Sequence, residues 1–181
     1  TLTWPGVTEK SPSLDISTQD DLIAVLRWMI REGINTVQLD SIALSEREIS
    51  AVMDPFSSYF EAYGFEAGNA RIGVRFKAGV KLLQAMRQGR EDRLDDAERK
   101  IADRARDVVS GLVSPDMTDV EKELAVHDYI AAHCQYQYNN LGENSRSVIG
   151  FFNDGRCSCA GFVDTFHLLA GLAGLDAEMI G

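Results

Sequence analysis

Cysteine and proline are scarce in this 181-residue chain, and long apolar runs are absent from it. Its three cysteines are too few for a disulfide-rich scaffold, and the odd number leaves at least one thiol free. Without a run of about eighteen apolar residues, the sequence predicts no membrane-spanning helix. The 18 basic residues are outnumbered by 28 acidic ones, and this net charge of −10 argues against a nucleic-acid or anionic-membrane partner.

The ends of the sequence bear on its origin. The chain begins at Thr1, with neither a methionine nor a signal-like segment. We therefore expect a processed or truncated piece, with any export signal or lipid anchor lying upstream. Localisation stays open, with an extracytoplasmic or cell-surface place slightly favoured.

The first 90 residues have the pattern of a small α+β unit. Capping residues and helical periodicity predict a helix over 18–32 and a second one from Ser45. Alternation of apolar and polar residues predicts strands over 34–42 and 71–77. Residues 80–86 are expected to be a hairpin partner, with a helix as the alternative. Because no candidate catalytic residues are visible in this unit, we interpret residues 1–90 as an accessory domain of unknown role.

Residues 91–181 read as a second, mainly helical domain. A highly charged stretch over 91–107 predicts an amphipathic helix with a solvated face. A capping box at Thr118 opens another helix that runs to about Cys134. One stripe of that helix is expected to be buried, and it consists of Val120, Leu124, His127, Ala131 and Cys134.

The stretch of greatest chemical interest is a glycine-marked loop with two cysteines, Cys157 and Cys159, followed by an apolar run. The run predicts a helix that begins at or next to Cys159. A cysteine in the first turn lies at the positive end of the helix dipole, which favours thiolate over thiol. Ala160 and Gly161 are expected to leave the approach to the sulfur open. On spacing alone, a small buried hydrophobe and a nucleophile are equally favoured for Cys159.

The histidines and Cys157 offer few partners for Cys159. A Cys157–Cys159 bridge has poor geometry, and no histidine has metal-ligand spacing with the two cysteines, so neither a metal nor a cofactor is expected. His167 lies about 12 Å further along the same helix, too far to act as the base. His127 is expected to be a hydrogen-bonded core histidine, and His133 stays open as a base.

Two separated segments resemble the transglutaminase-like superfamily. The first is Glu121–Ile130 with Tyr136, and the second runs from Gly155 to Leu175, so that the resemblance covers about residues 118–181. In this family a Cys-x-Gly-aromatic motif opens the core helix, and its cysteine is the nucleophile. The matching residues here are Cys159, Gly161 and Phe162.

The resemblance implies a papain-like fold with a Cys-His-Asp triad. Members form a thioester with a glutamine side chain or a peptide carbonyl, then pass the acyl group to an amine or to water. The histidine and the aspartate come from strands after the core helix, and the sequence ends at Gly181 before them. We therefore expect a truncated fragment that is itself inactive.

Together these observations predict an α+β protein, with a transglutaminase-like (papain-like) core over 91–181 that is truncated before the catalytic His and Asp strands. The predicted function is cysteine-dependent acyl transfer or hydrolysis on protein or peptide amides, through a thioester on Cys159 in the parent protein. The alternative is a non-catalytic interaction module that retains the fold, and a further reading makes Cys157 and Cys159 a redox switch. Missing strands would leave a sheet edge exposed, through which the protein could associate.

Overall fold

The computed structural model describes residues 12–139, 142 and 144–177. They form two compact units, the first ending at Phe76 and the second beginning at Lys77. The expected boundary at residue 90 therefore lies inside the second unit. Helices and strands are both present, in agreement with the predicted α+β class. Among the described helices, none combines the length and the apolar character needed to span a bilayer.

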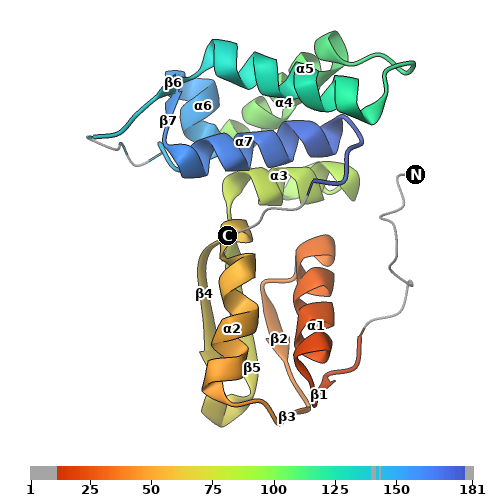
Figure 1. The fold of residues 1–181 in the computed structure, drawn as a ribbon, viewed down its shortest axis with the longest axis vertical. Helices are drawn as coiled ribbons and strands as arrows, with labels where there is room; N and C mark the ends of the chain where they lie inside the picture. The colour runs from red at the N-terminus through yellow and green to blue at the C-terminus, as the bar shows by residue number, and fades with distance from the viewer. Residues whose placement is uncertain (1–11, 140–141, 143, 178–181) are drawn as a thin grey trace. The chain divides into compact units, whose positions relative to one another are not determined.

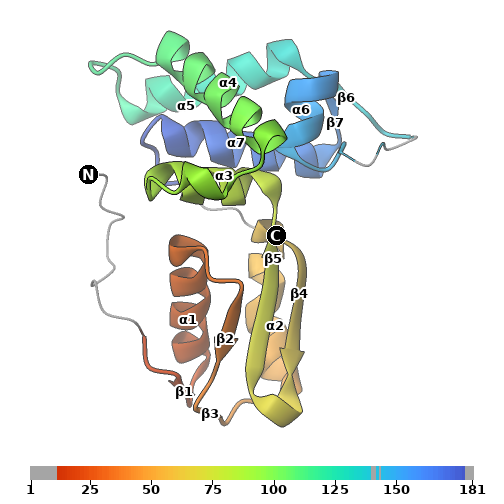
Figure 2. The ribbon, with the colours of Figure 1, turned by 180° about the vertical axis from the view of Figure 1, so that it is seen from behind.

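The first unit contains a three-stranded antiparallel sheet in the order β2-β5-β4. Its two α-helices, α1 and α2, lie on one face of this sheet (Figures 1 and 2). A short parallel pair, β1 and β3, lies in the same unit. Its elements are β1 (Asp15–Ile16), α1 (Gln19–Glu32), β2 (Thr36–Gln38), β3 (Ser41–Ile42), α2 (Glu46–Phe56), β4 (Phe60–Glu66) and β5 (Arg71–Phe76), with 3₁₀ turns over Ser57–Tyr59 and Ala67–Asn69.

Local signals account for the elements of this unit. Thr18 caps α1 through a capping box with Asp21, and Gly33 ends the helix with a φ of 68°. Both helix starts predicted for this unit are confirmed, since Ser45 caps α2 in the same way. In β5, alternate residues point to the core, and Ile72 is completely buried.

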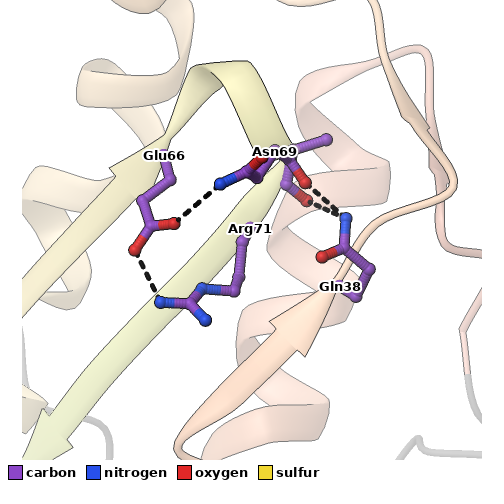
Figure 3. A network of polar contacts seen from close by, with 5 residues as sticks. Gln38, Glu66, Asn69 and Arg71 are labelled. Carbon is purple, nitrogen blue, oxygen red and sulfur yellow. Dashed lines mark hydrogen bonds and ion pairs between the residues drawn. The ribbon is translucent and has the colours of Figure 1, made fainter.

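A polar network joins the turn between β4 and β5 to the neighbouring strand β2 (Figure 3). Glu66 accepts hydrogen bonds from Arg71, at 2.6 Å, and from Asn69, at 3.4 Å. The amide of Gln38 donates to the carbonyl of Asn69 from β2. These groups are exposed, so the network sets the local turn while adding little to stability.

The prediction of a strand over residues 80–86 is wrong. This segment belongs to helix α3 (Ala78–Arg87), the first element of the second unit. Gly79, Leu82, Leu83 and Met86 follow helical spacing, and α3 packs against the core helix of that unit. This tertiary contact selects the helix, which was the alternative reading of the sequence.

The second unit is organised around α7, which contacts α3, α4, α5 and α6 (Figures 1 and 2). Strands β6 and β7 form a short parallel pair. After α3, its elements are a 3₁₀ turn over Glu91–Arg93, α4 (Asp96–Leu112), α5 (Asp119–His133), β6 (Gln135–Tyr136), α6 (Val148–Asp154), β7 (Arg156–Cys157) and α7 (Cys159–Leu172).

Helix α4 is shifted from its predicted place at 91–107. It begins at Asp96 because Asp95 forms a capping box with Glu98, and it continues to Leu112.

Helix α5 begins at the predicted capping box, but its predicted buried stripe is wrong. Val120 is 73% exposed and Leu124 is 57% exposed, whereas Val126 and Ile130 are buried. His127 lies on the exposed side as well, so it is not a core histidine. Apolar residues occur on two sides of this helix, and packing against α7 selects the side that carries Val126 and Ile130.

Candidate functional site

Cys159 is the first residue of α7, as the sequence predicts, and its side chain is exposed. The preceding Ser158 is the N-cap residue, but its side chain makes no capping hydrogen bond. Its amide and its hydroxyl both donate to the carbonyl of Ser145, at 2.8 and 3.3 Å. Ser158 thus anchors the loop around Ser145 to the start of α7, and it leaves the first-turn amides of the helix without a side-chain cap.

Gly161 has a packing role that differs from the one predicted. It is buried, and a Cβ atom added to it would lie 2.4 Å from the Cβ of Cys157 and 2.5 Å from the carbonyl oxygen of Ser145. Only glycine allows β7 and the Ser145 loop to approach α7 this closely. The glycine of the Cys-x-Gly motif therefore shapes the loop behind Cys159, and the idea that it opens the approach for a substrate is not supported.

An aromatic cluster, Tyr136, Tyr138 and Phe162, lies beside Cys159. Tyr136 forms a side-chain hydrogen bond with Cys159, and this bond raises the pKa of the tyrosine above its ordinary value. The Tyr136 ring is 5.8 Å from the Phe162 ring and 4.4 Å from the Tyr138 ring. In the sequence, Tyr136 stands out only as part of the family resemblance. Its contact with Cys159 could not be predicted, because β6 and α7 are distant in the sequence.

Two of the three histidines are on the surface of α5 and interact within that helix. The Nδ1 atom of His127 is 3.0 Å from a carboxylate oxygen of Asp128. The Nδ1 atom of His133 is 2.8 Å from the carbonyl of Tyr129, and the two rings stack at 4.1 Å. Neither contact involves Cys159.

His167 is the buried histidine of the protein's described part, with 4% of its surface exposed. Its Nδ1 atom is 3.2 Å from the carbonyl of Ala177. Burial, with a smaller contribution from Arg87, lowers the pKa of His167 to about 4. The ring is therefore neutral at pH 7, and it serves the packing of α7.

Asp164 is a completely buried carboxylate in the middle of α7. It accepts hydrogen bonds from the amide of Gly79 at 3.1 Å and from the amide of Val148 at 2.9 Å. Both donors are in the first turns of other helices, where amides lack partners within the helix. Asp164 thus joins α7 to α3 and α6. An acidic residue inside an apolar run was the signal that could have identified it.

Cys157 is completely buried, and its sulfur lies 2.7 Å from the sulfur of Cys134. Burial and this contact raise the pKa of Cys157 well above its ordinary value. The cysteine that Cys157 contacts is thus Cys134, a partner that the sequence reading of Cys157 and Cys159 as a redox switch did not include.

Other candidate sites lie elsewhere or are not formed. Within the described ranges, no group of three His, Cys, Asp or Glu side chains is arranged to hold a metal ion. A cavity of about 390 Å³ lies near the far end of α7, lined in part by Leu172, Ala173 and Val109. The exposed thiol and the aromatic cluster are therefore the chemical features at the start of α7.

Comparison with known protein families concerns this same segment. The family model of the transglutaminase-like superfamily matches residues 104–181. Those residues belong to the transglutaminase-like superfamily. The transglutaminase-like segment begins inside α4, earlier than the resemblance seen in the sequence, and it contains Cys159 together with the aromatic cluster. No curated protein matches the chain.

Proposed function

We propose that Cys159 is the nucleophile of a cysteine-dependent acyl transfer or hydrolysis reaction on protein or peptide amides. The observation that carries this proposal is the exposed sulfur at the first residue of α7, in the transglutaminase-like segment. Cys134 and Cys157 contact each other instead. Cys159 is therefore the exposed one of the three cysteines.

In the proposed reaction, the sulfur of Cys159 attacks the carbonyl carbon of the amide. The C–N bond breaks, the amine or ammonia leaves with a proton, and a thioester remains on Cys159. An amine or water then attacks the thioester and restores the thiol. A general base takes up the proton of Cys159 and returns it to the leaving group, and we assign no described histidine to that role.

Two features near Cys159 support stabilisation of the oxyanion that develops in this reaction. The first-turn amides of α7 receive no cap from Ser158, and they lie at the positive end of the helix dipole. The hydroxyl of Tyr136 already forms a hydrogen bond with Cys159, so it is within reach of a group bound to that sulfur. The aromatic cluster offers an apolar surface for the substrate side chain.

The proposal is tested by the rate at which each cysteine reacts with iodoacetamide and with a peptide that carries a chloroacetamide group. In the folded protein, Cys159 is expected to react about tenfold faster than the same cysteine in urea, because the helix terminus activates it. Cys159→Ser should lose the fast reaction, and the matched control Cys134→Ser should retain it.

Exposure alone would give a different result. An exposed but unactivated Cys159 would react at the same rate in the folded and the unfolded protein, and that outcome would overturn the proposal. It would favour a non-catalytic interaction module built on the transglutaminase-like fold. Peptide mapping of the labelled protein identifies which sulfur has reacted.

A further inference from the structure

Cys134 and Cys157 are brought together by the pairing of β6 with β7. Tyr136 is the register partner of Cys157 in this parallel pair, and Cys134 precedes Tyr136 by two residues. Side chains two residues apart in a strand share a face, so Cys134 and Cys157 project from the same face of the ribbon. Their sulfur atoms are 2.7 Å apart.

We propose that Cys134 and Cys157 form a disulfide when the protein is in an oxidising compartment, and that this bond holds β6 against β7 behind Cys159. The inference does not depend on the reaction proposed for Cys159. A sulfur–sulfur bond is about 2.04 Å long, so closing the pair requires only a small movement of side chains that already touch.

The burial of the two sulfurs sets the order of the chemical steps. Cys134 is partly exposed, whereas Cys157 is completely buried. The thiolate of Cys134 attacks an external disulfide, such as a protein disulfide or glutathione disulfide, forms a mixed disulfide, and releases one thiolate. Cys157 then loses its proton and attacks the sulfur of Cys134, which releases the second thiolate. Two protons pass to the two released thiolates, and the external disulfide is reduced as the pair is oxidised.

The bond would act on β6, which carries Tyr136, and on β7, which ends two residues before Cys159. Tyr136 follows Cys134 by two residues, and Cys159 follows Cys157 by two residues. The strands are short, and their backbone contact includes the bonds from Gln135 to the carbonyl of Gly155, at 2.8 Å, and from Gln137 to that of Cys157, at 3.0 Å. A covalent link at this point would restrain the relative movement of Tyr136 and Cys159.

Oxidation of the full 181-residue chain by glutathione disulfide tests the proposal. After quenching with N-ethylmaleimide in denaturant, the expected product contains one internal disulfide, whose formation consumes two of the three thiols and removes their two hydrogen atoms. Peptide mapping should find Cys134 linked to Cys157, with Cys159 outside this bond and carrying either N-ethylmaleimide or glutathione. The same bond is expected in Cys159→Ser, whereas Cys157→Ser should form only mixed disulfides with glutathione.

Two outcomes would overturn the inference. One is the absence of a bond between Cys134 and Cys157, and the other is a dominant bond from Cys159 to either of these two cysteines. Hydrogen exchange of the oxidised and reduced forms then tests the restraint itself, with several-fold slower exchange expected at Gln135 and Gln137 in the oxidised form. A bond that forms but leaves these amides unprotected would contradict the proposed effect on β6 and β7.

Discussion

The two compact units bury their residues in different ways. In residues 12–76, helices and strands each present one apolar side to the core, as α1 and β5 do. The ion pair between Glu66 and Arg71 lies at the surface there, and its two side chains are each about half exposed. In residues 77–177, α7 is buried on most of its sides and carries a buried Asp164 and a buried His167.

Glycine shows the same difference. Gly64 and Gly73, in the strands of the first unit, have open space where a Cβ would be. In the second unit, a Cβ atom added to Gly161 or to Gly171 would lie within 2.5 Å of a neighbouring atom. The first unit thus depends on the alternation of apolar and polar side chains along its helices and strands. The second unit depends on the close approach of its helices and loops at glycines, and on buried polar groups that are hydrogen-bonded to one another.

The largest expected effect is the loss of Asp164. In Asp164→Ala two buried amides lose their acceptor, and at about 2 kcal/mol for each the free energy of unfolding should fall by about 4 kcal/mol. Asp164→Asn keeps an acceptor oxygen and should cost about half as much. Urea unfolding followed by circular dichroism measures both. Equal, small effects of the two variants would show that the second unit does not depend on this carboxylate.

The next effect is a dependence of stability on pH that comes from His167. Its pKa in the folded protein, about 4, is below the ordinary value of about 6.5, so the unfolded chain binds the proton more readily. The stabilisation is complete above pH 6.5 and is lost as pH falls towards 4, by about 3 kcal/mol. His167→Gln should flatten this slope in urea titrations at several pH values, whereas the exposed control His127→Gln should leave it unchanged. An identical slope in the two variants would contradict the burial of His167.

Substitution of glycine by alanine compares the two units directly. Gly161→Ala should destabilise the protein by about 2 kcal/mol, because the added Cβ would collide with Cys157 and with the backbone of Ser145. The control Gly73→Ala, in β5, has open space and should change stability by less than about 1 kcal/mol. Thermal unfolding measures both variants. A tolerated Gly161→Ala would argue against close approach as the reason for this glycine.

The smallest effect is expected at the surface network of the first unit. Glu66→Gln removes the ion pair with Arg71 but keeps a group that can accept its hydrogen bond, so the loss of stability should be smaller than for any of the variants above. Added salt should reduce the difference from the parent protein. A loss as large as that of Asp164→Ala would remove the contrast between the surface and the buried carboxylates.

Much of the fold could be predicted from local patterns. The capping boxes at Thr18, Ser45 and Thr118 mark real helix starts, and α7 begins at Cys159 as expected. These features rest on hydrogen bonds and side-chain spacing within a few residues. The prediction failed where the apolar residues of a segment fit two arrangements, as at residues 80–86, which fit both a strand and a helix. Contacts with distant helices select between the two.

The candidate site divides in the same way. Cys159 could be singled out from its helix start and from the Cys-x-Gly-aromatic motif, whereas its contact with Tyr136 could not be found from the sequence. The partner of Cys157 was missed for the same reason, since Cys134 reaches it only through the parallel pairing of β6 and β7.

The amino-acid sequence alone determined where α7 begins and which cysteine stands at its first turn, because the helical spacing of apolar residues acts over a few residues. Folding determined that Cys134 faces Cys157, that Tyr136 touches Cys159, and that Gly161 must have no side chain. Each of these is a contact between segments far apart in the chain, and such contacts depend on how complete elements pack together.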